Sequence, residues 1–211
     1  LAIHAARRHE VLIWARDAQA AAAMTQERRN RRYLPDSEFP STLAVSSDLS
    51  RACDFLSQPD SLAVIATPVA GLAQTLSAIG SRLSDGSTEL VWLCKGLEAG
   101  SLRLPHQIAS PWLAQGRGAA LAGPSFAQEV AAGLPVALTV AGGAHALEQK
   151  VIAAFHHGSA RIYASDDALG VELGGALKNV MAIAAGIADG LALGMNARAA
   201  LITRGLAEIT R

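Results

Sequence analysis

One lysine stands in a long apolar stretch of this sequence, in a setting that suits proton transfer. Residues 170–190 read GVELGGALKNVMAIAAGIADG, which is rich in small and aliphatic residues and contains Lys178 as its only cation. The spacing of the aliphatic residues predicts one helix, and Gly174 and Gly175 would let a backbone or a ligand approach closely. Burial disfavours the charged form of a lysine, which then exchanges protons closer to neutral pH. Lys178 is therefore a candidate proton donor; the alternative is a lysine that reaches the surface from an ordinary core helix.

Two loops that follow expected strands carry further candidates. Lys95 lies in CKG at the end of the strand expected over 89–96, and Gly123 and Ser125 lie in AGPSFA after the next strand. The carboxyl ends of parallel strands are where open α/β sheets bind ligands. Lys95 could meet an anion there, Gly123 permits close approach, and Ser125 offers a hydroxyl and a backbone donor. The alternatives are a surface-loop lysine and an ordinary helix-capping serine.

The beginning of the chain resembles a Rossmann unit without its first strand and glycine-rich turn. In such units an acid after the second strand binds the ribose 2′-hydroxyl of NAD, and a basic residue accepts the 2′-phosphate of NADP. Arg16 and Asp17 are the last two residues of the strand expected over 10–17. Arg16 favours NADP, whereas Asp17 leaves NAD open. Both could instead be exposed charges at the end of a strand.

Helices positioned between strands define the expected architecture. The apolar content is 51% and aromatic residues are scarce at 4%, which suits helices packed on a parallel sheet. We expect an α/β, Rossmann-like, doubly wound and mainly parallel sheet over residues 1–165, followed by an all-helical segment over 166–211 that breaks at Gly190–Gly194 and restarts at Asn196. The expected strands are 10–17, 42–46, 61–68, 89–96, 136–143 and 160–165, and residues 118–126 are expected to form a strand that leads into a loop. The expected helices before residue 166 are 2–8, 18–30, 48–56, 69–83, 105–114, 126–132 and 144–156.

Bulk properties narrow the function classes. The formal net charge is zero, which implies no polyelectrolyte attraction to nucleic acid or to an anionic membrane. Cys53 and Cys94 are isolated, without metal-binding or disulfide spacing, so a reducing, cytoplasmic setting is expected and no metal site is predicted. No apolar run is expected to be long enough to span a membrane. The chain starts with Leu1 and both ends fall in helical patterns, so we expect a fragment of a longer protein.

Together these motifs resemble the bacterial NAD(P)-dependent glycerol-3-phosphate dehydrogenases. The match runs in order along nearly the whole chain, and CKGLE, GPSFA and GGALKNVMAIAAGI in combination are highly specific; the other matching segments are LIWARD, NRRYLPD, IATPVAG and NARAALITRGLAEI. The resemblance implies a cytoplasmic oxidoreductase that uses NADP or NAD. Its substrate would be small and phosphorylated, dihydroxyacetone phosphate reduced to sn-glycerol 3-phosphate for phospholipid synthesis. Nucleic-acid binding and membrane insertion are not implied, and a homodimer is left open.

The resemblance also assigns roles to individual residues. It makes Lys178 the catalytic proton donor and a substrate contact, and Lys95 a contact to both cofactor and substrate. Gly123 and Ser125 become substrate contacts, Ala127 a cofactor contact, and Arg16 a cofactor contact near the adenosine.

Two departures from the family pattern stand against these assignments. The glycine-rich loop that would precede Leu1 is missing, as are a substrate-binding aspartate and an Arg-Asn pair that would follow Arg211. We therefore expect a chain of this length alone to bind dinucleotide poorly and to be inactive. Two alternatives remain: a dehydrogenase of small β-hydroxyacids with a related fold, and a non-catalytic nucleotide-binding module.

Overall fold

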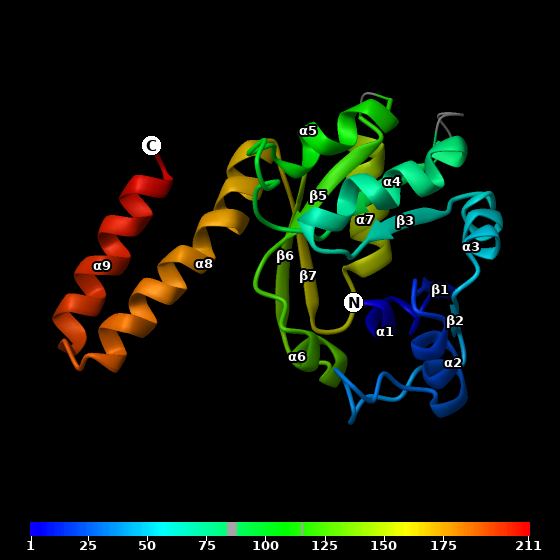
Figure 1. The fold of residues 1–211 in the computed structure, drawn as a ribbon, viewed down its shortest axis with the longest axis horizontal. Helices are drawn as coiled ribbons and strands as arrows, with labels where there is room; N and C mark the ends of the chain where they lie inside the picture. Colours follow the sequence, from blue (N-terminus) through cyan, green and yellow to red (C-terminus); the bar gives the residue numbers. More distant parts are fainter. Residues whose placement is uncertain (84–87, 115) are drawn as a thin grey trace.

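The computed structural model describes residues 1–83, 88–114 and 116–211 as a layered α/β body from which two long helices extend (Figure 1). The predicted alternation of strands and helices is confirmed, with boundaries that shift by a few residues. The elements in chain order are α1 (Ala2–Ala5), β1 (Val11–Trp14), α2 (Ala18–Glu27), β2 (Leu43–Ser46), α3 (Leu49–Leu56), β3 (Leu62–Ile65), α4 (Val69–Leu83), β4 (Glu89–Trp92), α5 (Pro105–Ala109), the 3₁₀ turn η1 (Ser110–Trp112), β5 (Gly118–Ala122), α6 (Ala127–Ala132), β6 (Val136–Ala141), α7 (His145–Phe155), β7 (Ala160–Ser165), α8 (Ala168–Gly190) and α9 (Gly194–Ile209).

The strands form two sheets rather than the single sheet expected. β1 pairs with β2 in parallel, and β3 to β7 form a five-stranded sheet in sequence order. All pairings in the larger sheet are parallel except that of β5 with β6, so the mainly parallel expectation is confirmed. The division falls between β1 and β3, because no strand of the described residues pairs with both of them. Both sheets remain Rossmann-like in their strand–helix alternation.

Alternating residues of the central strands build cores on both faces of the larger sheet. On β4, Val91 faces the core formed with α7, whereas Leu90 and Trp92 face the core formed with α4 and α5. This follows from the two-residue period of a strand. A third core joins α1 and α2 to the two-stranded sheet. The fully buried side chains of these cores include Leu43, Leu72, Leu76, Ile108, Leu138, Leu147 and Val151.

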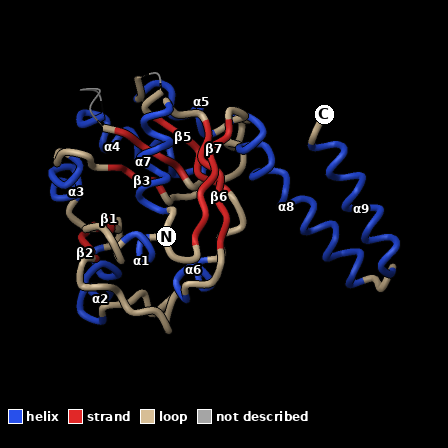
Figure 2. The backbone as a smooth tube through the Cα atoms, turned by 180° about the vertical axis from the view of Figure 1, so that it is seen from behind, coloured by secondary structure: helices blue, strands red, loops and turns tan. Residues whose placement is uncertain are grey.

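The α8–α9 pair leaves this layered body. The first turns of α8 pack against β5 and β6, and α9 then runs back alongside α8 (Figure 2). With 23 residues, α8 is long and apolar enough to cross a membrane by length and composition alone, so the expectation that no run has that length is wrong. A core helix of the same length passes the same test, and this helix carries Glu172, Lys178 and Asp189.

Three helix boundaries differ from expectation for local reasons. Pro111 lacks a backbone N–H, and α5 gives way to the 3₁₀ turn one residue before it. α9 begins at Gly194, which follows a turn with positive φ at Ala192, so Asn196 lies in the first turn and is not the N-cap. The N-cap of α6 is Phe126, so Ser125 lies one residue outside the helix and does not cap it.

Candidate active site

Lys95 lies where β4, β5 and α8 come together. Its Nζ donates a hydrogen bond to the carbonyl oxygen of Gly123 at 3.4 Å, which joins the loop after β4 to the loop after β5. Its aliphatic stem crosses α8 at Gly175, where a Cβ atom would lie 3.4 Å from Lys95 Cγ. The absence of a side chain at Gly175 therefore lets the lysine lie close along the helix.

Lys178 lies beside Lys95, and the structure thus brings together the two lysines that the sequence singled out. Burial lowers the pKa of Lys95, and the positive charge of nearby Lys178 lowers it further. Lys178 itself is exposed, so the expectation of a buried amine there is wrong for this chain. The reason is geometric: α8 moves away from the sheet after its first turns, and α9, which packs on α8 with Gly205 against Met181, leaves Lys178 exposed.

Gly123 adopts a conformation that no other residue would accept easily. Its φ is +152°, and a Cβ atom would lie 2.5 Å from the carbonyl oxygen of Ala137. The loop after β5 is thus pressed onto the backbone of β6. Ser125 is half-buried and Ala127 is exposed at the start of α6, and no polar contact of the described residues joins the Ser125 hydroxyl to either lysine.

Arg16 and Asp17 are at the end of β1, in the other sheet. Both are exposed. The Asp17 carboxylate caps α2, because its Oδ1 accepts hydrogen bonds from the backbone N–H groups of Gln19 at 2.9 Å and Ala20 at 3.2 Å. The acid is therefore already engaged in a structural role, whereas Arg16 has no hydrogen-bond or ion-pair partner within the described part of the chain.

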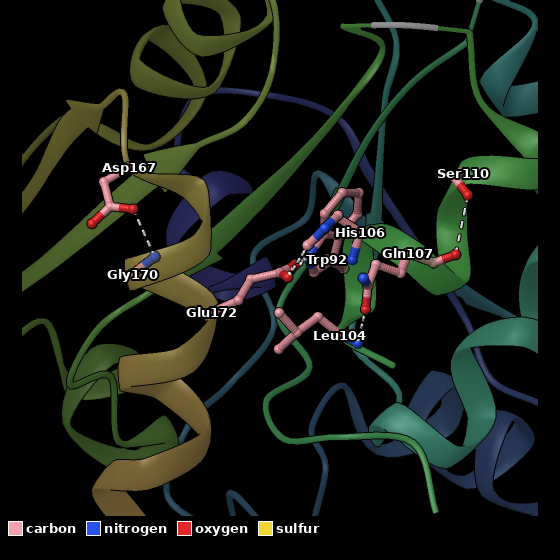
Figure 3. A network of polar contacts seen from close by, with 8 residues as sticks. All are labelled: Trp92, Leu104, His106, Gln107, Ser110, Asp167, Gly170 and Glu172. Carbon is pink, nitrogen blue, oxygen red and sulfur yellow. Dashed lines mark hydrogen bonds and ion pairs between the residues drawn. The ribbon is translucent and has the colours of Figure 1, made fainter. Parts of the chain in front are cut away.

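Glu172 is a residue of this region that sequence reasoning missed. Its carboxylate is 2% exposed and accepts hydrogen bonds from Trp92 Nε1 at 2.7 Å and from the backbone N–H of His106 at 3.1 Å. Its second oxygen pairs with His106 Nδ1 at 2.6 Å (Figure 3). Burial and the neighbouring Glu172 carboxylate raise the pKa of the Cys94 thiol to about 11. The available signal was a lone acid in the apolar sequence GVELGG.

The carboxyl edge of the sheet has features that fit a dinucleotide. The Oγ1 atom of Thr67, after β3, is buried and lacks a hydrogen-bond partner among the described residues. Buried hydroxyls usually have one, so a ligand atom would satisfy it. Gly96, in the loop after β4, has a φ of +108°, so this loop, like the one with Gly123, has a backbone turn without a side chain at that position. The loops after β3, β4 and β5 would therefore hold a dinucleotide along the carboxyl edge of the sheet.

The arrangement can bind an anion and give up a proton at one place. Two neighbouring ammonium groups, of which Lys95 is hydrogen-bonded to a strand-end carbonyl, attract a negatively charged ligand. A lysine with a lowered pKa, as found for Lys95, is closer to exchanging its proton near neutral pH than a lysine in water. Within the described residues, no group of three or more His, Cys, Asp and Glu side chains could hold a metal ion.

Strands alternating with helices, ligand-type loops at the carboxyl edge and a long helix beyond them define the class of Rossmann-like α/β proteins with a helical C-terminal segment. Within that class, the chain belongs to the NAD-dependent glycerol-3-phosphate dehydrogenase family. The model of the family's N-terminal domain matches residues 1–147, and that of its C-terminal domain matches residues 167–211.

Individual relatives agree with this assignment. The chain is 52% identical to glycerol-3-phosphate dehydrogenase [NAD(P)+] of Ralstonia nicotianae, over all of this chain and 63% of the relative. It is 50% identical to the protein of the same name from Cupriavidus pinatubonensis, of which it covers 62%. The crystal structure of glycerol-3-phosphate dehydrogenase from Coxiella burnetii superposes with a TM-score of 0.90 at 38% identity, over all of this chain and 63% of that one. The chain thus spans somewhat less than two thirds of these relatives.

Proposed function

We propose that the whole protein is an NAD(P)-dependent glycerol-3-phosphate dehydrogenase of the cytoplasm, which reduces dihydroxyacetone phosphate to sn-glycerol 3-phosphate for phospholipid synthesis. In this proposal residues 1–165 form the dinucleotide-binding domain and residues 166–211 begin the helical substrate domain. The observation that carries the proposal is the meeting of Lys95 and Lys178 beside the Gly123 carbonyl at the carboxyl edge of the sheet. The named relatives support the same substrate.

The two lysines divide the work at the substrate carbonyl. Bound NADH or NADPH would supply the hydride that reduces the carbonyl carbon. Lys178 Nζ donates a proton to the carbonyl oxygen, on which negative charge develops, and so completes the hydroxyl group. Lys95 holds the anionic substrate in place through its positive charge. Gly123 and Ser125 would line the substrate side of the same loop, and Ala127 the cofactor side.

The end of β1 favours a cofactor that carries a 2′-phosphate. Asp17 accepts hydrogen bonds from its own helix, whereas Arg16 is exposed and able to meet a phosphate. A basic side chain at this point of a Rossmann unit accommodates NADP. We therefore propose NADP as the preferred cofactor, with NAD as the second choice.

An assay of cofactor oxidation tests the function. The whole protein should oxidise NADPH when dihydroxyacetone phosphate is added, and should be much less active with a small β-ketoacid of similar size. Substitution Arg16→Ala should raise KM for NADPH more than KM for NADH. Absence of substrate-dependent NADPH and NADH oxidation would overturn the proposed function, and activity on the ketoacid alone would favour a β-hydroxyacid dehydrogenase.

A further inference from the structure

We propose that Glu172 is a positioning residue, which fixes α8 against β4 and α5 and thereby sets Lys178 beside Lys95. Its role in catalysis rests on the proposed function, but its effect on the two lysines does not. The inference starts from a carboxylate that is 2% exposed on a helix whose other buried residues are Gly175 and Ala188. A buried carboxylate is costly unless hydrogen bonds satisfy it, so its presence calls for a reason.

The carboxylate is satisfied entirely from other elements of the fold. The indole N–H of Trp92 comes from the last residue of β4, and both His106 contacts come from the first turn of α5. These donors lie 80 and 66 residues away in the sequence, so the contacts join parts of the chain that nothing local holds together. Three directional bonds restrict both the rotation and the translation of α8, which apolar packing alone would restrict less sharply.

The position of this contact connects it to both lysines. Trp92 precedes Lys95 by three residues on the same strand and loop. Glu172 precedes Gly175 by three residues, so both lie on neighbouring positions of one helix face, and the Lys95 stem crosses that face at Gly175. Lys178 follows three residues later. A helix anchored at Glu172 therefore has the crossing of Lys95 about one turn away, and the backbone of Lys178 lies about 9 Å along the axis from that of Glu172, at 1.5 Å per residue.

The chain has a composition that makes the test direct. It contains only three lysines: Lys95, Lys178 and Lys150. Lys150 lies on α7 and pairs with Glu89 at 2.5 Å, in a different part of the fold. After reductive methylation with ¹³C-formaldehyde, NMR should resolve three lysine signals, assigned with Lys95→Arg and Lys178→Arg, and the titration of each can be followed with pH. Lys178→Gln calibrates the readout, because removal of that cation should raise the pKa of Lys95.

The sign of the shift separates positioning from direct electrostatics. Removal of a nearby anion would by itself lower the pKa of Lys95, because the carboxylate favours the charged amine. If Glu172 holds α8 in place, Glu172→Ala lets Lys178 move away, and the pKa of Lys95 rises toward its ordinary value. Glu172→Gln keeps an oxygen for Trp92 and for the His106 N–H, so the lysine should titrate as in wild type or slightly lower.

Two further variants keep the experiment decisive. Glu148→Ala removes another buried carboxylate, on α7, and should leave the titration of Lys95 unchanged even if stability falls. If Glu172→Ala does not fold, Glu172→Leu decides, since leucine has a similar volume and cannot accept any of the three hydrogen bonds. An upward shift of the Lys95 pKa in Glu172→Leu then supports the proposal. If the variant used for the decision is folded and its Lys95 pKa is unchanged or lowered, the positioning role of Glu172 is overturned.

Activity provides a second readout that distinguishes the two proposals. In the active whole protein, kcat should fall roughly 10²-fold in Glu172→Ala, as expected for a displaced catalytic group, and should stay near wild type in Glu172→Gln. A wild-type protein without activity would overturn the proposed function while the lysine titration still tests the positioning role. Normal kcat in Glu172→Ala would overturn the positioning role and leave the proposed function in place.

Discussion

Residues 1–165 and the α8–α9 pair are held in place by different kinds of interaction. In the sheet region, large aliphatic side chains such as Leu72 and Leu147 are fully buried. On α8 and α9, large aliphatic side chains are mostly exposed, and the buried residues are Glu172 and the small Gly175, Ala188 and Gly205. The exposed ones include Val180, Ile183, Ile187, Met195, Ile202 and Leu206. Burial of large apolar side chains thus fixes the sheet region, whereas at the start of α8 the polar contact of Glu172 and the close approach at Gly175 act together with the partly buried Val171.

The largest expected effect is a loss of activity on substitution of Lys178, which lies on the less densely packed α8. In the whole protein, Lys178→Ala should lower kcat by roughly 10²–10⁴-fold, the range for loss of a general acid. The fold should persist, because Lys178 is exposed and its truncation leaves no buried cavity. Steady-state rates with dihydroxyacetone phosphate and NADPH, together with circular dichroism, would measure both.

The matched control for this variant is Lys150, the lysine of the sheet region that lies outside the candidate site. Lys150→Ala removes the ion pair with Glu89 and should leave kcat within a few-fold of wild type. Equal losses in both variants would mean that the two regions do not differ in function. Retained activity in Lys178→Ala would remove the lysine from the reaction.

The second effect concerns stability of the 211-residue chain. Leu147→Ala creates a cavity under the sheet and should lower the free energy of unfolding by about 2–5 kcal/mol. Ile183→Ala on α8 removes a side chain that is 65% exposed and should change it by less than about 0.5 kcal/mol. Urea denaturation followed by circular dichroism would measure both changes. A large loss in Ile183→Ala would show that this face is packed in solution.

The sequence predicted the sheet region well because its signals are local. Short apolar runs bounded by charge or proline identify strands such as β3, and the 3.6-residue period identifies helices such as α4. The loops with Lys95 and Gly123 could be placed at one edge because parallel strands end together. The family resemblance, carried by specific motifs in order, is confirmed by the matches to both family models.

What the sequence did not predict depends on partners far along the chain. A two-residue period assigns side chains to the two faces of a strand, and a 3.6-residue period assigns them to one face of a helix. Neither period shows which other element covers that face. The exposure of Lys178 and the division into two sheets are of this kind. So is Glu172, whose partners Trp92 and His106 have no marker in the sequence that points to a distant carboxylate.

The third effect contrasts a glycine of the sheet region with one of α8. Gly123→Ala places a Cβ atom 2.5 Å from a backbone oxygen at positive φ and should cost roughly 1–3 kcal/mol of stability. Gly174→Ala meets nothing within 4 Å in the middle of a helix and should stabilise the chain by about 0.5–1 kcal/mol. Thermal denaturation of the two variants against wild type would measure opposite shifts of Tm. Shifts of the same sign would contradict the contrast.

The smallest effect is a pH dependence that belongs to the sheet region alone. His157 stacks on His4 with ring centroids 3.9 Å apart, and its Nε2 is buried without a hydrogen-bond partner among the described residues. Burial lowers the pKa of His157 to about 4, and the charge of His4 acts in the same direction. Between the unfolded value of 6.5 and the folded value, the unfolded chain binds more protons, so stability falls as pH falls.

That loss should be about 1 kcal/mol between pH 7 and pH 5.5 from this group, and it should be absent above pH 7. His157→Phe keeps a ring for the stack and cannot titrate, so its stability should depend less on pH over this range. His145→Gln, which alters an exposed histidine on α7, should keep the wild-type dependence. Urea denaturation at a series of pH values would measure all three. The α8–α9 pair contains no histidine, so the effect of histidine titration is confined to the sheet region. If His157→Phe showed the same pH dependence as wild type, the effect would belong to other groups of that region.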